Sequence, residues 1–124
     1  MTYSFESVMA WQKAHVFVLA VYRITKHYPK EELFGLTSQF RRAAVSIEAN
    51  IAEGYKKLTK ADKLRFMNIS QGSIEECRDY VILSRDIDYI STEEFSELRD
   101  ALEDASRMLY FYCNGIKNNN GIKD

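Results

Sequence analysis

The side chains best suited to metal chemistry are two histidines, His15 and His27. Metal centres in helical bundles use Glu-x-x-His pairs that point inward from facing helices. Gln12 and Ile24 stand three residues before the two histidines, so neither histidine completes this motif. The sequence therefore predicts no metal centre. His15 lies on a broad apolar face of the first predicted helix and is expected to be a hydrogen-bonded packing residue.

Residues for nucleophilic or acid–base catalysis are also poorly placed. Ser46 and Ser73 lie in stretches without a histidine, and no glycine-rich phosphate loop is present. Glu53 and Glu76 could form a carboxylate pair if their helices meet, although a hydrogen-bond network is the favoured interpretation. The sequence therefore predicts a protein that is not an enzyme and binds no cofactor.

One basic cluster could contact nucleic acid, and it consists of Lys56, Lys57, Lys60, Lys63 and Arg65. Lysine contacts phosphate groups without reading the base sequence. Positive charge near a helix N-terminus opposes the helix dipole, which hints at a role beyond stability. The alternative interpretation is a solvated helix start with no partner.

A line of polar residues recurs at spacings of three and four along one predicted helix, comprising Gln39, Arg42, Ser46, Asn50 and Glu53. It could line a central channel, form a network across a subunit interface or within the chain, or contact a ligand. An arginine with carboxylate and amide partners suits a desolvated interface, because the guanidinium satisfies several acceptors. The network is therefore the favoured interpretation.

Four helices must position these residues, at roughly 7–28, 37–53, 60–88 and 92–117, followed by a frayed tail at 118–124. Pro29 ends the first helix, and Gly54 is expected to end the second in a left-handed conformation. Thr59 with Asp62, and the pair Ser91 and Glu94, have the capping-box spacing that begins a helix.

No strand pattern interrupts these helices, and the connections between them are short. The last helix carries a seam with the spacing of a coiled coil, made by Phe95, Leu98, Leu102, Ala105, Leu109, Tyr112 and Ile116. Gly72, in the middle of the third helix, suggests a close contact with another helix, or a kink. The prediction is one all-α domain, an antiparallel up-down four-helix bundle.

Composition narrows the class further. The 124 residues carry a net charge of −1, and residues 88–124 alone carry −4. A strong basic excess, as in dedicated nucleic-acid binders, is absent. No apolar run is long enough for a membrane span, no signal-peptide pattern is seen, and the two cysteines lack metal or disulfide spacing, so a cytoplasmic location is expected.

Several motifs resemble a known family. They are Trp11-Gln12-Lys13-Ala14, Phe34-Gly35-Leu36-Thr37-Ser38-Gln39, Arg41-Arg42-Ala43-Ala44-Val45-Ser46-Ile47, Ala49-Asn50-Ile51-Ala52-Glu53-Gly54 and Gly72-Ser73-Ile74-Glu75-Glu76. Together they resemble the 23S rRNA intervening-sequence proteins. The chain is also similar, more distantly, to the accessory variability determinant proteins of diversity-generating retroelements.

The resemblance implies an up-down bundle that assembles into a homopentameric ring. The retroelement proteins bind a reverse transcriptase and nucleic acid, and they are markedly basic, which this chain is not. Glu48 also stands where the family often has a proline.

The functional expectation is a non-enzymatic, homo-oligomeric binding or scaffold module. It would associate with RNA, DNA or a ribonucleoprotein through a rim formed by the basic cluster. The alternative is a protein-binding adaptor with no nucleic-acid role, whose acidic last helix faces a basic partner.

Overall fold

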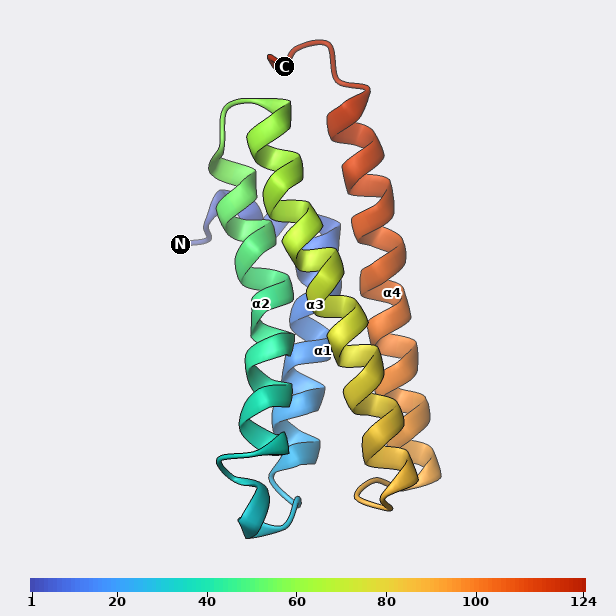
Figure 1. Cartoon of the computed structure of the whole chain (residues 1–124). Helices are drawn as coiled ribbons and strands as arrows, with labels where there is room; N and C mark the ends of the chain where they lie inside the picture. Colours follow the sequence, from blue (N-terminus) through green and yellow to red (C-terminus); the bar gives the residue numbers. More distant parts are fainter.

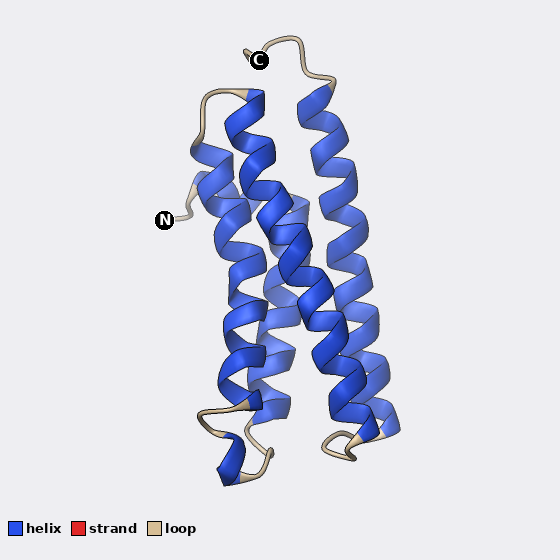
Figure 2. Ribbon diagram, viewed as in Figure 1, coloured by secondary structure: helices blue, strands red, loops and turns tan.

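The computed structural model describes residues 1–124, and all of its regular elements are helical (Figure 2). The long helices are α1 (Met9–Thr25), α2 (Leu36–Lys56), α3 (Lys60–Asp86) and α4 (Thr92–Lys117). Two short 3-10 helices, η1 (Ser4–Ser7) and η2 (Lys30–Glu32), precede α1 and α2. The predicted all-α class with four helices is therefore confirmed.

The four helices lie side by side and are joined by short connections at alternating ends (Figure 1). Helix α1 packs against α2 and α4, and α3 packs against the same two helices from the other side. The α1–α2 and α3–α4 connections share one end of the bundle, whereas the α2–α3 connection and the C-terminus share the other (Figure 1).

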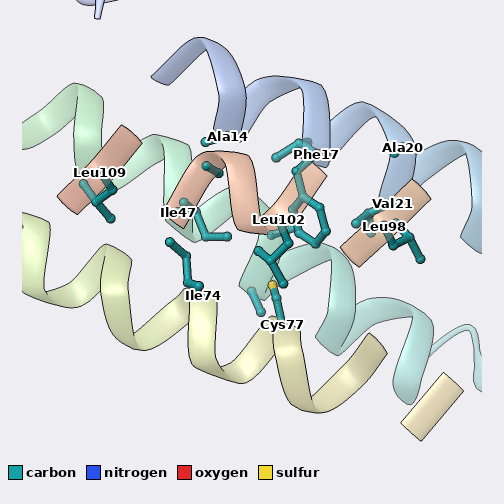
Figure 3. Close-up of a cluster of buried hydrophobic side chains, with 14 of the residues drawn as sticks. Ala14, Phe17, Ala20, Val21, Ile47, Ile74, Cys77, Leu98, Leu102 and Leu109 are labelled. Carbon is teal, nitrogen blue, oxygen red and sulfur yellow. The ribbon is translucent and has the colours of Figure 1, made fainter. Parts of the chain in front are cut away.

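The core follows the 3.6-residue periodicity of all four helices. Side chains that are almost completely buried come from each helix, as Phe17, Phe40, Met67 and Leu102 illustrate. Figure 3 shows this cluster, with Ile47, Ile74 and Leu98 among the labelled residues. The coiled-coil seam predicted for the last helix faces this core, with five of its seven residues buried and Phe95 and Tyr112 half-buried.

Two helix starts have the predicted caps. The Thr59 hydroxyl accepts a hydrogen bond from the Asp62 amide at 3.1 Å. Ser91 and Glu94 form a reciprocal capping box, with bonds of 2.8 and 3.0 Å. These side chains satisfy amides that a helix leaves without partners, which explains why α3 and α4 begin where they do.

The role predicted for Gly54 is wrong. Helix α2 continues to Lys56, and no glycine in the chain has a positive φ. A Cβ atom at Gly54 would lie 2.8 Å from the Cβ of Phe66 and 3.3 Å from the carbonyl oxygen of Lys63. Gly54 is thus present because α2 and α3 approach closely there, and not because the helix ends.

The expectation of a close contact at Gly72 is also wrong within the chain. Helix α3 runs through this position, and a Cβ atom there would meet no atom within 4 Å. Its neighbour Ser73 faces α2 instead, where its hydroxyl lies 2.9 Å from that of Ser46.

Two further boundaries differ in detail from those expected. Helix α1 ends at Thr25, and Tyr28 follows in a turn with its hydroxyl donating to Ser84 at 2.7 Å. The last residues, expected to fray, return to the start of α3. There the amide of Lys60 donates to the carbonyl of Lys123 at 2.7 Å.

Candidate functional site

Basic residues from three segments meet at the end of the bundle that holds the α2–α3 connection. This basic end consists of Lys56, Lys57, Lys60, Lys63, Arg65, Lys117 and Lys123. The first five are evident in the sequence, and the fold adds the last two, since Lys60 bonds to the backbone carbonyls of both Lys117 and Lys123. Lys56, Arg65, Lys117 and Lys123 are exposed.

Two members of the basic end have structural roles. The Lys60 ammonium donates to the carbonyl of Lys117 at 3.0 Å and lies 3.8 Å from the Asp124 carboxylate. The Lys63 ammonium donates to the carbonyl of Tyr55 at 2.6 Å, and burial lowers the pKa of Lys63. Both ammonium groups connect elements of the fold, so they are less available to a partner than Lys56.

Two other members lie on one aromatic ring. The Lys57 ammonium is 5.0 Å and the Arg65 guanidinium 4.9 Å from the centre of the Phe66 ring. Arg65 is also 3.7 Å from Asp62. Cation–π contacts of this kind stabilise the positions of the two cations.

The polar line of α2 divides into two parts. Ser46 and Asn50 belong to a network within the chain: the Asn50 amide donates to the carbonyl and the hydroxyl of Ser46, at 2.8 and 3.0 Å. Gln39 accepts a weaker bond of 3.3 Å from Tyr80. Arg42 and Glu53 are exposed and make no hydrogen bond or ion pair within the chain. The network interpretation stays a prediction for these two residues.

The other candidate groups for chemistry are also accounted for by packing. The His15 Nδ1 lies 2.8 Å from the Glu48 carboxylate, and the His15 ring stacks on Trp11 with centres 4.8 Å apart. Glu53 precedes Gly54, which packs against Phe66 and Met67 near the start of α3, whereas Glu76 lies more than two helical turns further along α3 and accepts a bond from Tyr80 at 2.8 Å. The two carboxylates therefore do not form a pair.

The sequence predicts none of the surface grooves, among them one between α1 and α2 and one between α3 and α4. The first lies between α1 and α2 and includes Phe34, Arg41 and Arg42. Within it, Arg41 stacks over Tyr22 at 4.7 Å and donates to the Thr25 hydroxyl at 2.9 Å. The only signal for this groove in the sequence is the apolar pair Leu33-Phe34 inside a connection.

The second groove lies between α3 and α4 and has a volume of about 250 Å³. Its apolar lining comes from Val81, Ile82, Phe95 and Leu102, and its charged lining from Arg78, Arg85, Arg99 and Glu103. This groove could not be predicted from periodicity, because it is formed by the side-by-side packing of two helices.

The acidic side chains of α4 are mostly neutralised by neighbours. Glu97 pairs with Arg23 of α1, and Glu103 accepts two hydrogen bonds from Arg78 of α3, at 2.7 and 2.9 Å. Asp100 and Asp104 pair with arginines of their own helix. The acidic face expected to attract a basic protein is therefore largely paired within the chain.

No group of three or more histidine, cysteine or acidic side chains is arranged to hold a metal ion. None of the helices combines the length and apolar character needed to cross a membrane.

Residues 6–111 match the model of the 23S rRNA-intervening sequence protein family. A search of curated proteins finds no match. Among solved structures, the chain is similar to a protein of unknown function from the S23 ribosomal protein family of Bacteroides thetaiotaomicron. The two are 21% identical, and the match covers 85% of this chain and 95% of the other, with a TM-score of 0.75.

Proposed function

The chain belongs to the family of 23S rRNA-intervening sequence proteins, and on this premise we propose that it is a non-enzymatic, homo-oligomeric scaffold that binds RNA through its basic end. The solved relative is itself described as a protein of unknown function, so the proposal rests on the geometry of this chain.

The observation that carries the proposal is the convergence of basic residues at one end. Lys56, Lys117 and Lys123 are exposed and come from α2, α4 and the C-terminal segment. A phosphate backbone is contacted by such a surface without base-specific readout. Because one copy offers only a few cations, a single chain would bind weakly, and several copies around a ring would multiply the contacts.

Exposed apolar side chains support self-assembly. Val16 and Leu19 of α1 are each 55% exposed, and Ile69, Leu83 and Ile87 of α3 are each more than 40% exposed. Apolar side chains that gather on helix faces mark surfaces that a partner covers. An up-down bundle assembling as a homopentamer is the arrangement that the family resemblance suggests.

The test is binding of a fluorescently labelled, structured RNA, followed by anisotropy at several salt concentrations. We expect the affinity of the unmodified protein to fall steeply with salt, because cations displace counterions from the phosphates. The variant Lys56→Glu/Lys117→Glu should bind far more weakly and with a smaller salt slope. Lys60 and Lys63 are left unchanged, since their ammonium groups support the fold.

The matched control is Lys26→Glu/Arg107→Glu, which reverses two exposed charges away from the basic end. It should bind RNA like the unmodified protein. Equal loss in both double variants would indicate a general charge effect and contradict a specific basic end. No binding at low salt would reject the RNA proposal and leave the protein-binding adaptor as the alternative.

A further inference from the structure

An aromatic side chain projects from the α1–α2 connection into solvent. Phe34 is 92% exposed and the preceding Leu33 is 52% exposed. Glu32 holds this connection in place, because its carboxylate accepts hydrogen bonds from the Leu36 amide at 3.2 Å and from the Tyr89 hydroxyl at 2.9 Å. The apolar pair is thus presented by a structured connection, which lowers the entropy lost when a partner covers it.

The groove between α3 and α4 has complementary chemistry. Its apolar floor can receive one aromatic side chain, and the Arg85 and Arg99 guanidinium groups lie 5.0 and 5.5 Å from the centre of the Phe95 ring. These two arginines pair only with the adjacent Asp86 and Asp100. Such exposed pairs are weak, so the arginines can also attract an incoming acidic segment.

The segment Glu31-Glu32-Leu33-Phe34 combines the features that the groove would accept. Glu31 is exposed and makes no ion pair, and it is followed by the two exposed apolar residues. The segment offers a negative charge to the arginines and an aromatic ring to the apolar floor. The Glu103 carboxylate in the groove lining is paired with Arg78, so Arg85 and Arg99 supply the positive charge that an acidic segment would meet.

The two surfaces are placed so that one copy can present each of them to a different neighbour. The connection lies on the α1–α2 side and the groove on the α3–α4 side, toward the same end of the bundle (Figure 1). The helix η2 of the connection packs against α2 and against neither α3 nor α4, so a chain does not fill its own groove. A contact between two unlike surfaces is heterologous, and it builds rings when the rotation between copies closes.

We propose that Phe34, with Leu33 and Glu31, docks into the α3–α4 groove of a second copy of this chain. This inference rests on the self-assembly proposed above and identifies the contact that builds it. The occupant is a copy of this chain because the complementary segment lies on the chain itself.

Two single variants test the contact by light scattering coupled to size-exclusion chromatography. Phe34→Ala removes the inserted ring, and Ile82→Glu places a charge in the groove that repels Glu31. Ile82 is 46% exposed and Phe34 is 92% exposed, so both changes leave the core intact. Each variant alone should fall to the monomer mass of 14.5 kDa while its helical circular dichroism is unchanged.

Mixing the two variants tests whether the Phe34 segment of one chain binds the groove of the other. The Ile82→Glu chain keeps Phe34, and the Phe34→Ala chain keeps the groove, so an equimolar mixture should form a species of twice the monomer mass. The control Leu58→Ala removes an apolar side chain that is 86% exposed near the other end of the bundle, and it should assemble like the unmodified protein.

The outcomes separate this inference from the proposed function. If the unmodified protein and both variants are all oligomeric, the docking contact is wrong and self-assembly stands. If the unmodified protein is monomeric, both the docking contact and the proposed self-assembly are contradicted. If the variants are monomeric but their mixture stays monomeric, or if Leu58→Ala also dissociates, the heterologous pairing is overturned.

Discussion

Gly54 and Gly72 show how the same residue type can have opposite consequences in neighbouring helices. Gly54 is buried where α2 touches Phe66 and the backbone of Lys63, so even one methyl group has no room. Gly72 faces open space on α3. At a helix position where no neighbouring atom lies close, glycine only adds flexibility to the unfolded chain and weakens the helix.

We therefore expect Gly54→Ala to destabilise the protein by about 1–3 kcal/mol, because overpacking forces α2 and α3 apart. Gly72→Ala should instead stabilise the protein by roughly 0.5–1 kcal/mol. Urea unfolding followed by circular dichroism measures both. A destabilised Gly72→Ala variant would contradict the open space, and would indicate that another copy covers this face.

Arg42 is the member of the polar line whose role depends most on a partner. Its guanidinium is exposed and unpaired in the chain, in contrast to Arg41 beside it, which donates to Thr25. Arg42 also lines the same groove as Phe34. An arginine that keeps several donors free at such a place can satisfy acceptors on an adjoining copy.

Arg42→Ala should accordingly reduce the assembly state without lowering the helix content, as analytical ultracentrifugation would show. Arg107→Ala is the matched control, since Arg107 is exposed and pairs only with Asp104 of its own helix. An unchanged sedimentation profile for Arg42→Ala would reject an interface role for this residue.

Between elements, Arg78 is the main polar connection of α3 to α4. Its guanidinium donates to both oxygens of Glu103 and, at 3.0 Å, to the Ser106 hydroxyl, and it also contacts Glu75 on its own helix. The hydrogen bonds from Arg78 hold the pKa of Glu103 below its ordinary value of 4.5. The same carboxylates raise the pKa of Arg78.

A carboxyl group whose pKa is lower in the folded state contributes stability above its unfolded pKa, and loses it as the pH falls through the folded value. Glu103→Gln should therefore reduce the loss of stability as the pH falls below about 4.5, the ordinary pKa at which a glutamate in the unfolded chain is half protonated. Urea midpoints measured between pH 7 and pH 3 test this. The same pH dependence of stability in Glu103→Gln and in the unmodified protein would contradict a stabilising contact between Arg78 and Glu103.

For the whole molecule, the distribution of apolar surface matters more than any single contact. The four helices bury one shared core, yet Phe34, Val16 and Leu19 remain more than half exposed. These residues lie on the outside of the bundle, where the core cannot cover them. Self-assembly would bury them without changing the fold.

If assembly stabilises the folded chain, the thermal midpoint must depend on protein concentration. We expect differential scanning calorimetry to give a midpoint that rises when the protein is concentrated tenfold. In the Phe34→Ala variant the midpoint should be independent of concentration. A midpoint that does not move in the unmodified protein would argue that the exposed apolar side chains have no partner copy.

Much of the helical architecture is determined by the sequence itself. The alternating spacing of four and three in Leu98, Leu102, Ala105 and Leu109 predicts which face of α4 is buried. The Thr59 and Ser91 caps predict where α3 and α4 begin. These signals are local, because helix periodicity and capping depend on residues within one or two turns. The Glu-x-x-His motif is also local, so its absence before His15 and His27 can be read from the sequence alone.

Only the tertiary structure decided what depends on residues far apart in the chain. It placed Phe66 against Gly54, where the sequence suggests a helix end, and it brought Lys117 and Lys123 to the basic cluster. It also formed the α3–α4 groove and left Phe34 exposed on the opposite side. The residues next to a glycine, a lysine or a phenylalanine in the sequence do not show whether its side chain will be buried or exposed. Packing between helices decides this, because it brings together residues that are far apart in the chain.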